Sequence, residues 1–150
     1  MTTIFDVADW FLSKEPMTHK KVQKLCYYYK AWGLALYDVD LLPDATFEAW
    51  VHGPVNPSLY QKYKDMMWND IPQTADNSSI FNEKELDILE SVWLTYKDFS
   101  ANELEAKTHI DMPWRNARGD LDDFAICNAV ISNDDMKNFY REKYLRQQGE

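Results

Sequence analysis

The chain has 150 residues, of which 45% are hydrophobic and 15% aromatic, enough for one domain with a buried core over residues 1–150. This composition excludes a disordered chain, which would be poor in aromatic residues. The formal net charge of −9, from 25 acidic residues against 16 lysines and arginines, argues against binding to nucleic acid or a membrane surface and favours a cationic partner.

The N-terminal part of the chain predicts two helices. Thr3 is a suitable N-cap for the first, and Pro16 is expected to end it. Thr18 opens a second, longer helix. Apolar residues from Val22 to Leu36 recur there at helical spacing, so this helix is expected to run through the core.

A strand and a third helix are predicted next. Residues 46–52 alternate between apolar and polar side chains, which indicates a strand that Gly53 and Pro54 end. Asn56 followed by Pro57 then has the pattern of an N-cap and a first helical position. The polar segment 71–79 is expected to be a loop.

The C-terminal half predicts further helices. Capping boxes at residues 82–85 and 100–103 open two of them, and Ser132 caps a last helix that reaches about residue 146. Residues 129–131 are expected to form a short second strand. The fold class is therefore mainly α (α+β), a single compact helical domain with a minimal β-sheet or hairpin.

Four motif segments follow one another along the chain. The most specific is FEAWVHGPV from Phe47, followed by Leu59-Tyr60. The others are MTHKKVQKLCYY from Met17, then Tyr96 with Phe99-Ser100-Ala101 and Leu104, and finally Thr108-His109 with Pro113-Trp114 and Ala117-Arg118-Gly119. With these segments in this order, the chain resembles the Panacea family, also called SocA-like or GepA-like, over about residues 17–131.

The resemblance implies an antitoxin that neutralises a protein toxin by direct binding, with no catalytic residues and no cofactor. At least one SocA-type member instead acts as an adaptor that hands its toxin to a protease. The resemblance leaves open the roles of the N-terminal helix and of segment 71–79. The motif residues are expected to be structural: Lys24, Leu25, Tyr27, Trp50, Gly53, Pro54, Val55, Tyr60, His109, Pro113, Trp114 and Arg118.

The titratable residues give little support to an enzyme or a metal site. The three histidines and Asp111 lack ligand spacing such as His at i and i+4. Cys26 lies on the apolar stripe of its helix, and Cys127 is also in apolar surroundings, so both are expected to be buried free thiols rather than nucleophiles. The histidines are His19, His52 and His109.

Two aromatic residues and an arginine have specific structural interpretations. Trp50 is expected to seal the small sheet against a helix, and Trp114 to fill the core at a corner where His109 binds a carbonyl. Arg118 is expected to pair with a nearby carboxylate. The candidates for that pairing are Asp120, Asp122 and Asp123.

The charged clusters leave two interpretations open. Asp120, Asp122 and Asp123, like Asp134 and Asp135, fit either solvated faces and helix N-termini or an acidic surface that binds a cationic toxin. The basic residues also cluster locally near the N-terminus, with Glu15 opposing them. They are Lys14, Lys20, Lys21, Lys24 and Lys30.

The favoured function is the antitoxin of a type II toxin–antitoxin system, bound to a toxin from the adjacent gene. The alternatives are a proteolytic adaptor, which also binds a protease, and a small hydrolase or nucleotide-acting enzyme that uses His52, His109 and Asp111. A DNA-binding autorepressor is disfavoured by the net charge and by the lack of a clear helix-turn-helix pattern. No export signal or long apolar stretch is evident, so we expect a cytoplasmic protein.

Overall fold

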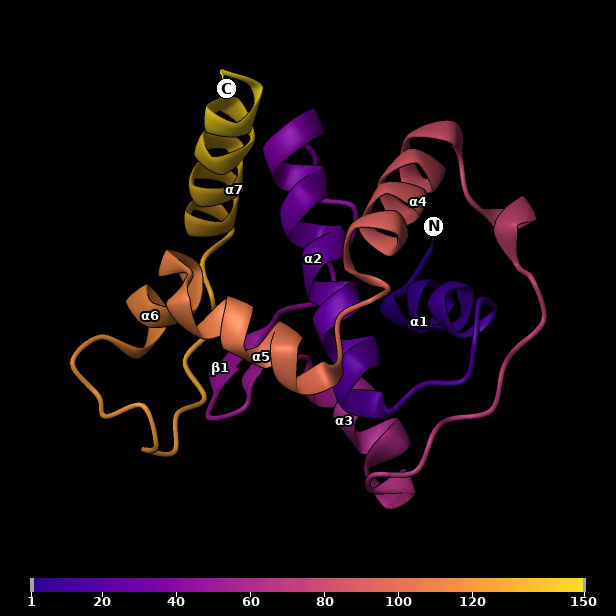
Figure 1. The fold of residues 1–150 in the computed structure, drawn as a ribbon, viewed down its shortest axis with the longest axis horizontal. Helices are drawn as coiled ribbons and strands as arrows, with labels where there is room; N and C mark the ends of the chain where they lie inside the picture. Colours follow the sequence, from indigo (N-terminus) through magenta and orange to yellow (C-terminus); the bar gives the residue numbers. More distant parts are fainter. Residues whose placement is uncertain (1, 150) are drawn as a thin grey trace.

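The structure, a computed structural model, describes residues 2–149, and this part of the chain is mainly helical (Figure 1). The prediction of an α-rich fold with a minimal sheet is confirmed. The α-helices are α1 (Ile4–Leu12), α2 (His19–Tyr37), α3 (Pro57–Tyr63), α4 (Glu83–Tyr96), α5 (Ala101–Ile110), α6 (Met112–Arg118) and α7 (Asn133–Gln148). The short elements are strands β1 (Glu48–Trp50) and β2 (Gly53–Val55) and the 3-10 helices η1 (Lys64–Met66) and η2 (Ser78–Ile80).

Helix α2 is the centre of the molecule. Every residue from 22 to 31 is buried, because α1, α4, α5 and α7 and the β2 strand all contact this helix (Figure 1). A helix that is covered on all sides in this way belongs to the core. Its tyrosines provide much of the packing, and Tyr28 stacks on Tyr96 of α4 with ring centroids 3.9 Å apart.

The predicted helix starts are confirmed by their capping hydrogen bonds. A capping side chain accepts a backbone N–H at the start of six α-helices, and each such cap stabilises its helix by about 1 kcal/mol. These N-cap residues are Thr3, Thr18, Asn56, Asn82, Ser100 and Ser132.

The helix ends agree less closely with the predictions. Helix α1 ends at Leu12, four residues before Pro16, and the Ser13 N–H bonds the Asp9 and Trp10 carbonyls. Helix α7 runs to Gln148, slightly beyond the expected end.

The sheet differs from the prediction at Gly53 and Pro54. These residues do not lead the chain out of the sheet; they form β2, which pairs antiparallel with β1 in the register Ala49↔Pro54 and Trp50↔Gly53. Gly53 has a φ of 101°, which a residue with a side chain rarely adopts, and this conformation turns the chain back. On the other edge of β1, residues 129–131 make a single bridge between Glu48 and Val130 rather than a full strand.

Segment 71–79 is mostly a loop, as predicted, with the 3-10 helix η2 beginning at Ser78, and it is fastened to α1. The Thr74 hydroxyl donates to the Asp9 carbonyl, the Asn77 amide donates to the Asp6 carbonyl, and Trp10 Nε1 donates to the Ser78 hydroxyl 3.0 Å away. The N-terminal helix and this loop therefore support each other. Within residues 2–149, none of the helices combines the length and the apolar character needed to span a bilayer.

Candidate functional site

Three motif side chains converge on the carbonyl groups of the β-hairpin. Lys24 Nζ donates to the Pro54 carbonyl at 3.1 Å, and Trp114 Nε1 donates to the Trp50 carbonyl at 2.8 Å. Arg118 Nη1 donates to the Ala49 carbonyl at 2.8 Å. All three side chains are buried. We call the β1–β2 hairpin with Lys24, Trp114 and Arg118 the hairpin frame.

Arg118 binds backbone rather than carboxylates, so the predicted pairing with Asp120, Asp122 or Asp123 is wrong. Its Nη2 atom donates to the Asp122 and Ala125 carbonyls, and its guanidinium lies 4.7 Å from the Trp114 ring centroid. A planar guanidinium with five donors can hold several carbonyls at once. Arg118 therefore ties the segment that follows α6 to the hairpin frame.

The segment after α6 exposes an unusual amount of apolar surface. Phe124 is 86% exposed and Ile126 is 94% exposed, and Leu121 and Val130 are also on the surface. The acidic side chains Asp120, Asp122 and Asp123 alternate with them and are exposed as well. We call residues 119–130 the acidic–apolar loop; in Figure 1 it projects from the body of the molecule below α6.

The acidic–apolar loop is anchored, although it has little regular structure. Asp122 makes a local turn, because its carboxylate accepts the Phe124 N–H at 2.8 Å and its carbonyl accepts the Ala125 N–H at 2.9 Å. Ile126 and Cys127 then line a hollow of about 390 Å³ together with Trp50. Exposed apolar groups beside a polar rim are typical of protein-binding surfaces. The loop is therefore the candidate partner-binding surface.

Sequence reasoning identified the acidic residues of this loop but missed Phe124 and Ile126. The available signal was the mixture of acidic and apolar residues in a segment with neither helical nor strand periodicity. Cys127 was also misjudged, because it is partly exposed beside Ile126 rather than buried.

Lys24 and Gly53 are packed against each other on a second side of the hairpin frame. A Cβ at position 53 would lie 2.8 Å from Lys24 Cε and 3.0 Å from the Thr108 hydroxyl. Glycine is therefore required there for space as well as for its backbone conformation. Burial, reinforced by nearby Lys20 and opposed by Glu105, lowers the pKa of Lys24 to about 7.

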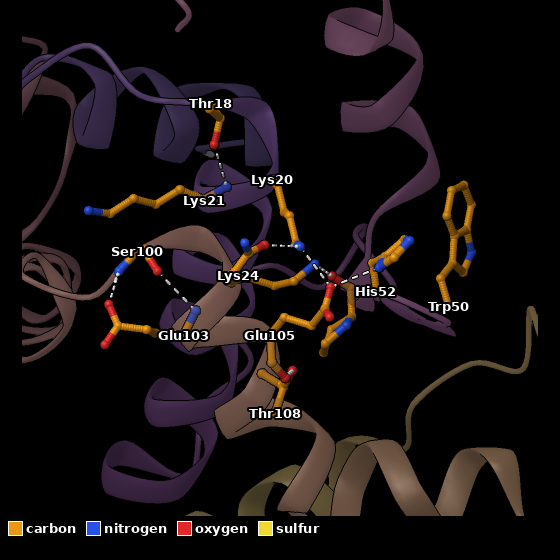
Figure 2. A network of polar contacts seen from close by, with 12 residues as sticks. Thr18, Lys20, Lys21, Lys24, Trp50, His52, Ser100, Glu103, Glu105 and Thr108 are labelled. Atoms are coloured by element: carbon orange, nitrogen blue, oxygen red, sulfur yellow. Dashed lines mark hydrogen bonds and ion pairs between the residues drawn. The ribbon is translucent and has the colours of Figure 1, made fainter. Parts of the chain in front are cut away.

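Glu105 links two basic residues near Lys24. Its carboxylate lies 2.7 Å from Lys20 Nζ and 2.9 Å from His52 Nδ1, as the dashed lines in Figure 2 show. Burial raises the pKa of Glu105, but these two hydrogen bonds outweigh that effect and leave the pKa below its ordinary value. Glu105 thus remains ionised and fixes both side chains at the N-terminal end of α2.

The residues of the hydrolase alternative each have a different partner. His52 binds Glu105, and His109 stacks on Trp114 with ring centroids 4.1 Å apart. Burial lowers the pKa of His109, while nearby Glu105 and the Val51 backbone oppose that shift. Asp111 accepts a hydrogen bond from the Tyr140 hydroxyl at 2.8 Å, and burial raises the pKa of its carboxyl group.

The remaining candidates for chemistry are placed as follows. Cys26 is fully buried, as predicted, and burial raises the pKa of its thiol, which disfavours the nucleophilic thiolate. His19 lies at the N-terminus of α2 with its ring edge-on to Tyr60. Within residues 2–149, no three or more His, Cys, Asp or Glu side chains are grouped so that they could hold a metal ion.

The packing predictions for Trp114 and Trp50 are both confirmed, although Trp50 is less buried. Trp114 is 1% exposed and fills the corner between α5 and α6. Trp50 does pack edge-on against Tyr60 of α3, with centroids 5.0 Å apart, but it is only partly buried. Its remaining surface lines hollows on two sides of the hairpin.

Comparison with known proteins places this architecture in a family. A family model described as "Antitoxin SocA-like, Panacea domain" matches residues 22–115, which cover α2 from Val22 onward, the hairpin, α3, α4, α5 and the first part of α6. No curated protein and no solved structure matches the chain. The matched residues contain most of the hairpin frame and stop before the acidic–apolar loop. The chain belongs to the Panacea-domain family of SocA-like antitoxins.

Proposed function

We propose that this chain is the antitoxin of a type II toxin–antitoxin system, acting in the cytoplasm, and that it holds its cognate toxin with the acidic–apolar loop. The observation that carries the proposal is the exposure of Phe124 and Ile126, at 86% and 94%, on a loop that Arg118 fixes to the hairpin frame. Anchored apolar side chains of this kind lose less conformational entropy on binding than those of a free loop.

The chemistry of the loop suits binding rather than catalysis. Burial of an aromatic or branched aliphatic side chain stabilises a complex by about 1.5–3 kcal/mol, and a few such residues dominate many interfaces. Asp120 and Asp123 add negative charge around them. That charge would accelerate association with a basic toxin surface, such as one that binds RNA.

The family assignment supports an antitoxin role. The position of the acidic–apolar loop, outside the family-matched residues, supports the proposal that this loop contacts the toxin. The resemblance implies one shared frame that serves many different toxins. Contacts to one particular toxin are then expected outside the shared part. The acidic–apolar loop lies outside the matched residues 22–115, although Arg118 ties it to the hairpin that lies within them.

The test is co-expression with the protein from the neighbouring gene, using Phe124→Asp with Ile126→Asp. We expect the wild-type chain to restore growth and to copurify with the toxin, and the double variant to lose both properties while its circular dichroism is unchanged. Leu94→Asp on α4 is the matched control, because Leu94 is 67% exposed and also apolar. It should behave as the wild type.

Two outcomes would contradict the proposal. A double variant that still restores growth and still copurifies would remove the loop from the interface. Restored growth without a detectable complex would contradict the proposal that the chain neutralises the toxin by binding it directly. Toxin half-life, measured in the same cells, separates a blocked toxin from one delivered to a protease, because only the adaptor alternative shortens it.

A further inference from the structure

A basic pocket lies at the N-terminal end of α2, on a chain whose net charge is −9. The pocket has a volume of about 440 Å³, and its described lining includes five basic residues and no acidic one. Glu105, behind the lining, offsets Lys20 and His52. Within residues 2–149, Lys24 and Lys64 make no ion pair within 4.0 Å. The basic residues are His19, Lys20, Lys24, His52 and Lys64.

Lys24 is the buried polar group of this pocket. It is 1% exposed, and within residues 2–149 the Pro54 carbonyl is the one acceptor for its Nζ atom. An ammonium group has three donors, so two of them have no acceptor in the described chain. Leaving such donors unmatched in a buried position is unfavourable. An anion in the pocket would satisfy them and would also favour the charged form of Lys24.

The rest of the pocket is aromatic and apolar. Trp50 and Tyr60 meet edge-on in its wall, and Trp68 is 72% exposed at the rim. The residue before Trp68 is Met67, a non-glycine residue with a φ of 54° whose side chain is also exposed. Outliers of this kind cluster at ligand sites. Flat aromatic side chains next to basic ones favour a ligand that joins a planar ring to an anionic group.

We propose that this pocket binds a nucleoside phosphate, with the phosphate on Lys24 and Lys64 and the base against Trp50, Tyr60 and Trp68. The volume of the pocket is within the range of small-molecule sites. An acidic side chain from a protein partner would also satisfy Lys24, but it would leave the aromatic surface without a matching ring. The pocket is distinct from the acidic–apolar loop, so the proposal does not depend on toxin binding.

Isothermal titration of the full chain at low salt tests the proposal, with ADP as the probe and with adenosine and inorganic phosphate as its separate halves. We expect ADP to bind, and each half to bind more weakly. Lys24→Met should weaken ADP binding by at least about tenfold, because it removes a charged hydrogen bond. Lys84→Met on α4, outside the pocket, should have no effect.

A second variant guards against a folding defect at the buried position. Trp68→Ala changes an exposed side chain, and it should leave the thermal midpoint unchanged while it weakens ADP binding by roughly tenfold. Absence of ADP binding at millimolar concentration would overturn the proposal, as would equal affinity of wild type and Trp68→Ala. Binding of a glutamate-containing peptide in place of ADP would also overturn it and assign the pocket to a protein partner.

Discussion

The hairpin frame and the acidic–apolar loop are joined by Arg118, yet they differ in their physical character. The frame is built from buried side chains that each hold a backbone carbonyl, and most of it lies within the family-matched residues 22–115. The loop is exposed, acidic and apolar, and it lies outside that match. In the proposed function, holding the fold and contacting the toxin are therefore tasks for different residues of this molecule.

The largest expected effect separates the two tryptophans of the frame. Trp114→Ala should lower the free energy of unfolding by about 3–5 kcal/mol, because it leaves a large cavity and an unpaired Trp50 carbonyl. Trp50→Ala should cost only about 1–2 kcal/mol, since that side chain is partly exposed. Urea unfolding measures both. Equal losses would contradict the difference in burial.

Arg118→Met should break the connection between the frame and the loop. We expect a loss of about 2–4 kcal/mol, because the Ala49, Asp122 and Ala125 carbonyls lose a charged donor. Limited proteolysis should then cut the loop faster. Arg115→Met, at an exposed arginine of the same helix, should change stability by less than about 0.5 kcal/mol. Unchanged proteolysis in Arg118→Met would argue that the loop is held by other contacts.

Phe124→Ala with Ile126→Ala should weaken toxin binding without lowering the stability of the fold, unlike the Trp114 and Arg118 variants. Stability should stay within about 0.5 kcal/mol, because both side chains are exposed. Toxin affinity should fall by roughly 30-fold or more, as expected for two central interface residues. Surface plasmon resonance against the toxin, with Leu94→Ala as control, decides this. A large stability loss with intact affinity would place these residues in the frame instead.

The pH dependence of stability tests the buried position of Lys24. Because burial, helped by Lys20, lowers the pKa of Lys24 from 10.5 to about 7, the unfolded chain binds more protons than the folded chain above about pH 7. The contribution of Lys24 to stability therefore improves as pH rises through that window. The stability of Lys24→Met relative to wild type should therefore be higher at pH 6 than at pH 9. Lys24 is also one cause, after burial, of the lowered pKa values of His19 and His109, so Lys24→Met raises both toward their ordinary values and favours the variant at low pH, in the same direction.

A pH-independent difference between Lys24→Met and wild type would show that Lys24 keeps its ordinary pKa. Urea unfolding at the two pH values, on the same preparations, is sufficient. The measurement needs neither toxin nor ligand.

The smallest expected effect concerns the charge of the loop. Asp120→Asn with Asp123→Asn should slow association with a basic toxin by a few-fold at low salt and by less as screening shortens to about 8 Å at physiological ionic strength. Dissociation should change little. Asp122 is left intact because its carboxylate holds the Phe124 N–H. Stopped-flow association that is independent of salt would mean that the acidic residues serve solubility alone.

The sequence predicted the helices well because their signals are local. Thr3, Asn82 and Ser100 each mark a helix start with a capping box of four residues, and all three are present. Gly53 was harder, because a glycine before a proline fits both a strand exit and a turn back into a hairpin. Only pairing with Ala49 and Trp50 decides between them.

The candidate sites were harder to predict because they depend on contacts between distant segments. Carboxylates next to Arg118 in sequence suggested ion pairs, but the backbone of residues 122–125 and of Ala49 offered a better match to its fork of donors. The exposure of Ile126 and the burial of Lys24 likewise follow from tertiary packing. For Ile126 the sequence offered only the mixture of acidic and apolar residues around it, and for Lys24 it offered no such signal.

Helix α7 has a practical consequence for the design of truncated or fused versions of this antitoxin. It lies against α2 along much of its length, with Met136 and Tyr140 fully buried, although it lies outside the matched residues 22–115 (Figure 1). The Tyr140 hydroxyl meets both Tyr27 and Asp111. A fusion trimmed to the family boundary would thus leave a tyrosine-rich stripe bare and would aggregate. The family-matched segment therefore leaves out a helix that covers part of the core.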